Sequence, residues 1–145
     1  MADPINIVLA DDHPLLRRAV RTLLHSKDGL KVIAEAADGQ EAVRLVRDLR
    51  PNLAIVDAHM PKLNGIEAAR KITGLPSPPK VIILTAFSAR DLVFKAFEAG
   101  CFAYVLKSST AADLIVAIHE ALEERWFLSA PLRYLQAELE ERFGG

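Results

Sequence analysis

Five polar residues stand at the ends of short apolar runs, and their types suit phosphoryl chemistry. They are the acidic pair Asp11-Asp12, then Asp57, Thr85 and Lys107. Each one alone has an ordinary explanation, such as a helix cap for an aspartate or a solvated end residue for the lysine. Those explanations do not account for all five together, because each strong apolar run ends in a group that fits a metal and phosphate site.

Three carboxylates gathered in one place repel one another, and a cation relieves that repulsion. Ligands made only of oxygen favour Mg²⁺ or a similar hard ion such as Mn²⁺. A carboxylate can also attack a phosphoryl group and form an aspartyl phosphate. In such a site Lys107 would add positive charge and Thr85 would donate a hydrogen bond to a phosphate oxygen. The residue types therefore predict a Mg²⁺-dependent phosphoryl site with Asp57 as the nucleophile.

Hydrophobic patterns indicate the elements that would position these residues. Nearly continuous apolar runs indicate strands that are covered on both faces. The strong runs are residues 5–10, 53–56, 81–84 and 102–106, and residues 31–36 form a weaker edge strand. Helical patterns separate them, which predicts a doubly wound α/β fold with a five-stranded parallel sheet. In such folds the functional site lies beyond the carboxyl ends of the strands.

Capping signals set the expected ends of two helices. Ser88 with Asp91 and Thr110 with Asp113 each have the spacing of a capping box, and each pair precedes an apolar helical pattern. Gly100 fits the carboxyl end of the first of these helices.

Composition narrows the classes of function. The chain has 145 residues, 51% of them hydrophobic and 26% charged, which fits one globular domain. Its net charge of −1 argues against DNA binding by this segment alone. Cys101 is the single cysteine and is expected to be a small buried filler, which suits a reducing compartment. With no apolar run of membrane length and no signal-like start, a cytoplasmic location is expected.

Four segments resemble the receiver domain of bacterial two-component response regulators, over about residues 5–125. The segments are Ile-Val-Leu-Ala-Asp-Asp-His-Pro (7–14), Ala-Ile-Val-Asp-Ala-His-Met-Pro-Lys-Leu-Asn-Gly (54–65), Val-Ile-Ile-Leu-Thr-Ala (81–86) and Gly-Cys-Phe-Ala-Tyr-Val-Leu-Lys (100–107). The sequence Lys107-Ser108-Ser109, at the end of the last segment, resembles that of the LuxR/NarL/FixJ-type subfamily of response regulators. The resemblance implies a flavodoxin-like sheet with strand order 2-1-3-4-5.

The resemblance also implies a role for each site residue. Asp57 would accept a phosphoryl group from a histidine kinase or from a small phosphodonor. Asp12 and Asp57 would bind Mg²⁺ directly, Asp11 would act partly through water, and the backbone carbonyl of His59 would complete the protein ligands. The side chain of His59 is a poor ligand for this metal.

The same resemblance assigns a conformational switch. Lys107 would contact the phosphoryl group, and Thr85 would move toward it. The ring of Tyr104 would turn inward to fill the space that Thr85 vacates. Dimerisation on phosphorylation would fit the family, although the sequence does not indicate the face.

The C-terminal segment is predicted to be a separate unit. Residues 1–127 would form the receiver, and residues 128–145 a linker with an amphipathic helix that leads toward a DNA-binding output domain absent from this chain. The apolar face of that helix carries Leu132, Leu135, Leu139 and Phe143. It would pack on its own domain or on a second copy, or remain a frayed tail. The chain is either a fragment of a transcription regulator or a stand-alone receiver.

Two other classes of function fit the sequence less well. Haloacid-dehalogenase-like phosphatases use an Asp-x-Asp motif, whereas His59 occupies the second position here. A flavodoxin-type binding module needs a Gly-rich or Ser/Thr-rich phosphate loop after a strand, and the loops lack one. A phosphoacceptor switch, with only slow loss of the phosphoryl group, is therefore preferred to an enzyme.

Overall fold

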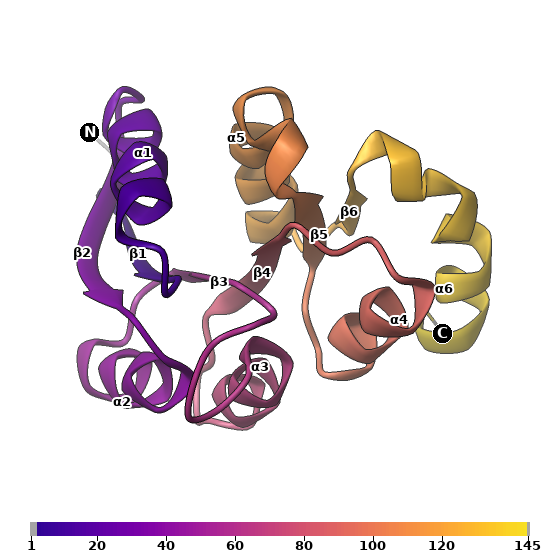
Figure 1. Cartoon of the computed structure of the whole chain (residues 1–145), viewed down its shortest axis with the longest axis horizontal. Coiled ribbons are helices and arrows are strands. Elements are labelled where there is room, and N and C mark those ends of the chain that lie inside the picture. Colours follow the sequence, from indigo (N-terminus) through magenta and orange to yellow (C-terminus); the bar gives the residue numbers. More distant parts are fainter. Residues whose placement is uncertain (1–2, 145) are drawn as a thin grey trace.

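A parallel sheet forms the centre of the protein, and helices cover both of its faces (Figure 1). The computed structural model describes residues 3–144. The strands within this range are β1 (Ile5–Ala10), β2 (Leu30–Ala36), β3 (Leu53–Val56), β4 (Lys80–Thr85), β5 (Ala103–Leu106) and β6 (Phe127–Leu128). The helices are α1 (Pro14–His25), α2 (Gly39–Leu49), α3 (Gly65–Thr73), α4 (Arg90–Glu98), α5 (Thr110–Leu122) and α6 (Gln136–Phe143).

The strand order β2-β1-β3-β4-β5-β6 confirms the predicted order 2-1-3-4-5 and adds one strand outside β5. All neighbouring strands are parallel. The added strand, β6, has two residues, which is too short to stand out as an apolar run. It is held at the edge because Phe127 donates to the carbonyl of Phe102 at 3.0 Å, and the buried Ser129 hydroxyl accepts the Leu106 amide at 3.0 Å.

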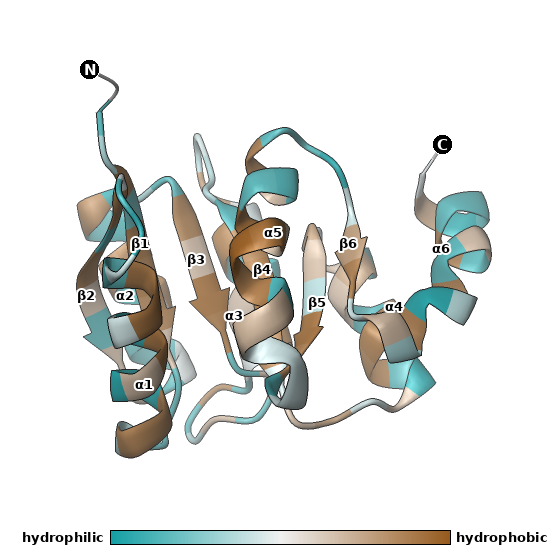
Figure 2. Ribbon diagram, turned by 90° about the horizontal axis from the view of Figure 1, so that it is seen from above, coloured by the Kyte–Doolittle hydropathy of each residue, from teal (hydrophilic) through white to brown (hydrophobic). Residues whose placement is uncertain are grey.

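Two apolar layers explain why the strands read as nearly continuous hydrophobic runs. α1 and α5 lie on one face of the sheet, and α2, α3 and α4 lie on the other (Figure 1). Along β3, Ile55 packs into the first layer and Val56 into the second, and both are buried. Figure 2 shows apolar residues concentrated in the strands between these layers. No helix within residues 3–144 is long and apolar enough to cross a membrane.

The two predicted capping boxes were wrong. A cap at Ser88 would make Ala89 the first helical residue, but α4 begins at Arg90 and Ala89 occupies the cap position. No side chain of the described residues caps this helix. A short 3₁₀ turn, Lys107–Ser109, precedes α5, so Thr110 is already helical and its hydroxyl donates to the carbonyl of Lys107. Gly100 follows the end of α4 with φ +98°, which agrees with its predicted place at the carboxyl end of this helix.

The C-terminal segment packs against its own domain. A 3₁₀ helix, Ala130–Leu135, leads into α6, and the apolar face of the whole segment is buried at Leu132, Leu135 and Leu139. The rings of Phe143 and Phe94 lie 6.3 Å apart, which joins α6 to α4. Glu138 of α6 also forms an ion pair with Arg90 of α4. Three arrangements were predicted for this segment, and the structure shows the one in which it packs on its own domain.

Cys101 is 2% exposed and lies in the apolar layer beside α4. Burial raises the pKa of its thiol to about 12, because the thiolate would lose its hydration. The thiol therefore stays protonated, which agrees with the predicted role as a buried filler.

Candidate functional site

Residues from three different strand ends meet at one edge of the sheet. Asp11 follows β1 and Asp57 follows β3, while Lys107 follows β5. The Nζ atom of Lys107 lies 2.7 Å from Asp57 Oδ2 and 2.9 Å from Asp11 Oδ2. The lysine ammonium thus bridges two carboxylates that are distant in the sequence, as expected where the carboxyl ends of parallel strands converge.

Backbone hydrogen bonds hold both buried carboxylates in place. The amides of Asp11 and Asp57 continue the sheet ladder past the ends of their strands, each donating to a neighbouring strand at 3.0 Å. One oxygen of each carboxylate accepts an amide two residues ahead: Asp11 Oδ1 from His13 at 2.8 Å and Asp57 Oδ1 from His59 at 3.2 Å. The opposite oxygens face Lys107, so both carboxylates have a fixed orientation.

The charge of Lys107 is retained despite its partial burial. Burial by itself would lower the pKa of the ammonium, but the hydrogen bonds that it donates to Asp57 and Asp11, and the charges of these carboxylates, outweigh that effect. The pKa of Lys107 is therefore raised above its ordinary value, and the side chain is a cation at neutral pH. One ammonium beside three carboxylates still leaves an excess of negative charge.

The carboxylate cluster fits a divalent cation. Carboxylate oxygens of Asp11, Asp12 and Asp57 and a ring nitrogen of His13 all lie within 4.8 Å of one another. The Oδ1 atom of Asp12 is buried and has no hydrogen-bond partner among the residues described. An unsatisfied buried acceptor is costly unless a cation or ordered water meets it. Excess negative charge and an unsatisfied oxygen together support the predicted Mg²⁺ or Mn²⁺ site.

His13 and His59 occupy different places around this cluster. His13 was missed as a neighbour of the carboxylates, although its position directly after the acidic pair was a usable signal. The ring of His59 stacks on that of Phe87 with centroids 4.0 Å apart. The roles of the His59 side chain and of its backbone carbonyl toward a metal both stay predictions.

Thr85 and Tyr104 lie beside the cluster and are both buried. Thr85 is the last residue of β4, and its hydroxyl accepts the Phe87 amide at 3.5 Å. The Tyr104 hydroxyl donates to the carbonyl of Phe87 at 2.6 Å. Burial raises the pKa of the Tyr104 hydroxyl, and the charge of Asp57 raises it further. The hydroxyl therefore stays protonated and remains a donor. The ring is buried in this structure, and its part in a switch stays a prediction.

Gly65 sets the shape of the loop that follows Asp57. A Cβ atom at this position would lie 1.7 Å from the carbonyl oxygen of Asp57 and 2.9 Å from the Cα of Ala58. The Gly65 amide donates to the Ala58 carbonyl at 2.9 Å, which brings the start of α3 against the end of β3. Any side chain at residue 65 would therefore push the backbone of the proposed phosphoacceptor.

We expect Gly65→Ala to lower the free energy of unfolding by about 2 kcal/mol or more, because the added Cβ overlaps rigid backbone. Urea denaturation measures this change. Gly74→Ala is the matched control, since a Cβ there would make ordinary contact at 3.5 Å with the carbonyl oxygen of Lys71. Equal stability of the two variants would contradict the close packing of Gly65 against Asp57.

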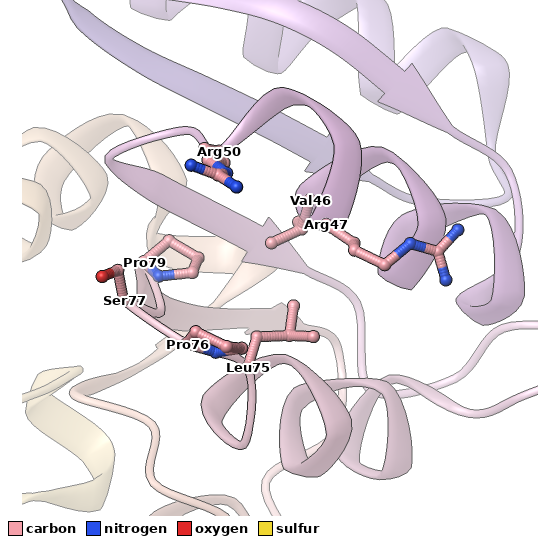
Figure 3. Close-up of a pocket in the computed structure, with 7 residues that line it drawn as sticks. All are labelled: Val46, Arg47, Arg50, Leu75, Pro76, Ser77 and Pro79. Carbon is pink, nitrogen blue, oxygen red and sulfur yellow. The ribbon is translucent and has the colours of Figure 1, made fainter.

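A pocket of about 270 Å³ lies elsewhere, between the end of α2 and the segment that enters β4 (Figure 3). Its lining residues are Val46, Arg47, Arg50, Leu75, Pro76, Ser77 and Pro79. Pro79 immediately precedes β4, so this pocket lies at the amino end of that strand. It is separate from the carboxylate cluster, which lies at the carboxyl ends.

The strand order and the acidic cluster at the carboxyl ends define a flavodoxin-like α/β domain of the signalling type. The model of the response regulator receiver domain matches residues 7–119. The chain therefore belongs to the family of response regulator receiver domains, whose general mechanism is phosphorylation of an aspartate.

Relatives and solved structures agree with this assignment. The transcriptional regulatory protein LiaR of Bacillus subtilis (strain 168) is 40% identical over 117 residues, which are 81% of this chain and 56% of LiaR. The nitrate/nitrite response regulator protein NarL of Escherichia coli (strain K12) is 31% identical and is matched over 90% of this chain and 60% of NarL. The chain thus spans little more than half the length of these relatives.

A two-component response regulator of the LuxR family from Aurantimonas sp. SI85-9A1 has a similar crystal structure. It superposes with a TM-score of 0.87 at 38% identity, over 97% of this chain and 99% of that one. Because the match covers almost the whole of both chains, it extends beyond residues 7–119 into the C-terminal segment.

Proposed function

We propose that this chain is a phosphoacceptor switch in which Asp57 receives a phosphoryl group from the phosphohistidine of a sensor histidine kinase. The bridge from Lys107 to both Asp57 and Asp11, at 2.7 and 2.9 Å, carries the proposal. It places a cation directly beside the carboxylate that would act as the nucleophile. The unsatisfied oxygen of Asp12 supports a divalent cation beside it.

In the proposed reaction a carboxylate oxygen of Asp57 attacks the phosphorus atom. A new P–O bond forms as the P–N bond of the phosphohistidine breaks, and the imidazole leaves with the bonding electrons. Lys107 exchanges its hydrogen bond with Asp57 for one to a phosphoryl oxygen. Asp12 and Asp57 would hold a Mg²⁺ ion directly, with Asp11 acting partly through water and the carbonyl of His59 completing the set. The bound ion would neutralise charge on the phosphoryl oxygens.

A chain of contacts leads from this site to the C-terminus. Thr85 and Tyr104 both bind the backbone of Phe87, through its amide and its carbonyl. The same loop leads into α4, where Arg90 pairs with Glu138 of α6. We propose that a phosphoryl group which attracts Thr85 shifts this loop and alters how α4 holds α6.

The proposed output of the switch follows from the position of α6 at the end of this chain of contacts. Relatives such as LiaR are transcriptional regulatory proteins, and the match to this chain covers only 56% of LiaR. We propose that α6 leads into a DNA-binding domain and that phosphorylation favours a homodimer, so that DNA is bound only through that further domain. Light scattering with and without beryllofluoride tests the dimer, and a monomer under both conditions would exclude it.

The phosphoacceptor function is tested by mass spectrometry of the intact chain after treatment with acetyl phosphate and Mg²⁺. We expect an adduct of about 80 Da, one phosphoryl group per chain. Chelation of the divalent cation should suppress the adduct, because the excess negative charge of the cluster then repels the phosphodonor. An adduct that forms equally well without a divalent cation would contradict the proposed metal site. Turnover well beyond one equivalent would instead indicate an enzyme.

A further inference from the structure

The imidazole of His13 lies over the acidic pair, and its hydrogen bond with Asp11 Oδ1 accounts for only part of this arrangement. Its Nδ1 atom is 3.1 Å from Asp12 Oδ1 and 3.3 Å from Asp11 Oδ1. The oxygen of Asp12 nevertheless receives no hydrogen bond from any described residue, although it is buried. A ring nitrogen and a carboxylate oxygen thus approach each other closely while the oxygen stays unsatisfied.

These separations match those between ligands of one metal ion. Neighbouring ligands in an octahedral site with bonds of about 2.1 Å lie about 3.0 Å apart. In a tetrahedral site with bonds of about 2.0 Å the ligands lie about 3.3 Å apart. The distances from His13 to Asp12 and Asp11, 3.1 and 3.3 Å, fall in this range.

The backbone holds His13 in this position before any ion arrives. Pro14 restricts the preceding residue to extended conformations, and His13 has φ −99° and ψ 104°. The amide of His13 donates to Asp11 Oδ1 at 2.8 Å, which closes a tight turn around the carboxylate. The side chain of His13 is 68% exposed, so little packing opposes a small rotation toward an ion. The backbone of His13 is thus already ordered before an ion binds, and only the side chain has to adjust.

We propose that His13 is an additional ligand of this metal site and that it extends the site's selectivity to transition metal ions such as Zn²⁺ and Co²⁺. Imidazole nitrogen is a good ligand for these ions, whereas Mg²⁺ prefers oxygen. With His13 the cluster offers a nitrogen and the carboxylates of Asp11 and Asp12 to a single ion. Mg²⁺ would use the carboxylates and leave His13 unbound. The proposal takes the location of the cation from the proposed function and adds a second class of cation to it.

Isothermal titration with Zn²⁺ and with Mg²⁺ tests the role of His13. We expect His13→Ala to weaken Zn²⁺ binding by about tenfold or more, because one ligand is lost, and to change Mg²⁺ binding by less than about twofold. His13→Gln, which keeps a polar side chain, should behave like the alanine variant. Sites of this kind bind Zn²⁺ more tightly than Mg²⁺ in general. This preference is the same in all variants, so it cancels when each variant is compared with the original chain for the same ion.

Two other histidine variants serve as matched controls. His119→Ala removes an exposed imidazole on α5, and His25→Ala removes an exposed imidazole at the end of α1. Both should keep the Zn²⁺ affinity of the original chain. In the Co²⁺ complex, the visible absorption spectrum should change in His13→Ala alone. Equal Zn²⁺ affinities for His13→Ala and the original chain, or an equal loss in His25→Ala, would overturn the assignment.

The titration also separates this proposal from the phosphoacceptor function. If the 80 Da adduct fails to form while His13→Ala still loses Zn²⁺ affinity, the role of His13 as a metal ligand is supported and the phosphoacceptor function is refuted. If the adduct forms and the titrations of His13→Ala and the original chain coincide, only the role of His13 is refuted.

Discussion

Replacing Asp57 by asparagine should abolish the phosphoryl adduct completely. The amide of asparagine keeps the size of the side chain but lacks the anionic oxygen that attacks phosphorus. The substitution also removes the negative charge that Lys107 contacts at 2.7 Å, while Asp11 still pairs with the ammonium at 2.9 Å. Intact mass after acetyl phosphate and Mg²⁺ should show the unmodified chain alone.

The control for Asp57→Asn is Asp48→Asn. Asp48 lies on α2 with 54% of its side chain exposed and pairs with the adjacent Arg47. Its carboxylate is far from the cluster in the fold, so the variant should form the adduct as the original chain does. An adduct that survives in Asp57→Asn would transfer the acceptor role to another carboxylate, first of all Asp11 or Asp12. Urea unfolding of both variants shows that the result reflects chemistry and not misfolding.

Leu139→Ala should lower the free energy of unfolding by about 2–4 kcal/mol. Leu139 is fully buried and belongs to the same apolar layer as α4. Truncation to alanine removes buried methyl groups and leaves a cavity, because the surrounding backbone relaxes only in part. The measurement is equilibrium unfolding in urea, which reports the whole domain if α6 unfolds together with it.

Tyr134→Ala is the control for Leu139→Ala within the same C-terminal segment. The Tyr134 side chain is large, but the residue is 72% exposed, so its loss should change stability by less than about 0.5 kcal/mol. If both variants were equally stable, α6 would be detached in solution. The proposed route from Asp57 through α4 to α6 would then lose its last step.

Much of the site was predictable from the sequence because it depends on local patterns. Continuous apolar runs predicted β1, β3, β4 and β5, and parallel strands must end at a common edge. Asp57 and Lys107 could therefore be assigned to one cluster although fifty positions separate them. The two capping boxes failed because a capping pattern does not specify the residue at which the helix begins. β6 was missed because its two residues are held by the edge of β5, a partner distant in the sequence.

The sequence by itself determined which side chains reach the functional edge of the sheet. Only the tertiary structure decided how they meet there: Lys107 bridges two carboxylates, Tyr104 binds the carbonyl of Phe87, and His13 stands over Asp12. It also decided that α6 packs on α4, since an amphipathic pattern shows that a face is buried but not what covers it. The reason is physical. Periodicity records the burial of each residue, whereas distances between side chains depend on packing among elements that are remote in the chain.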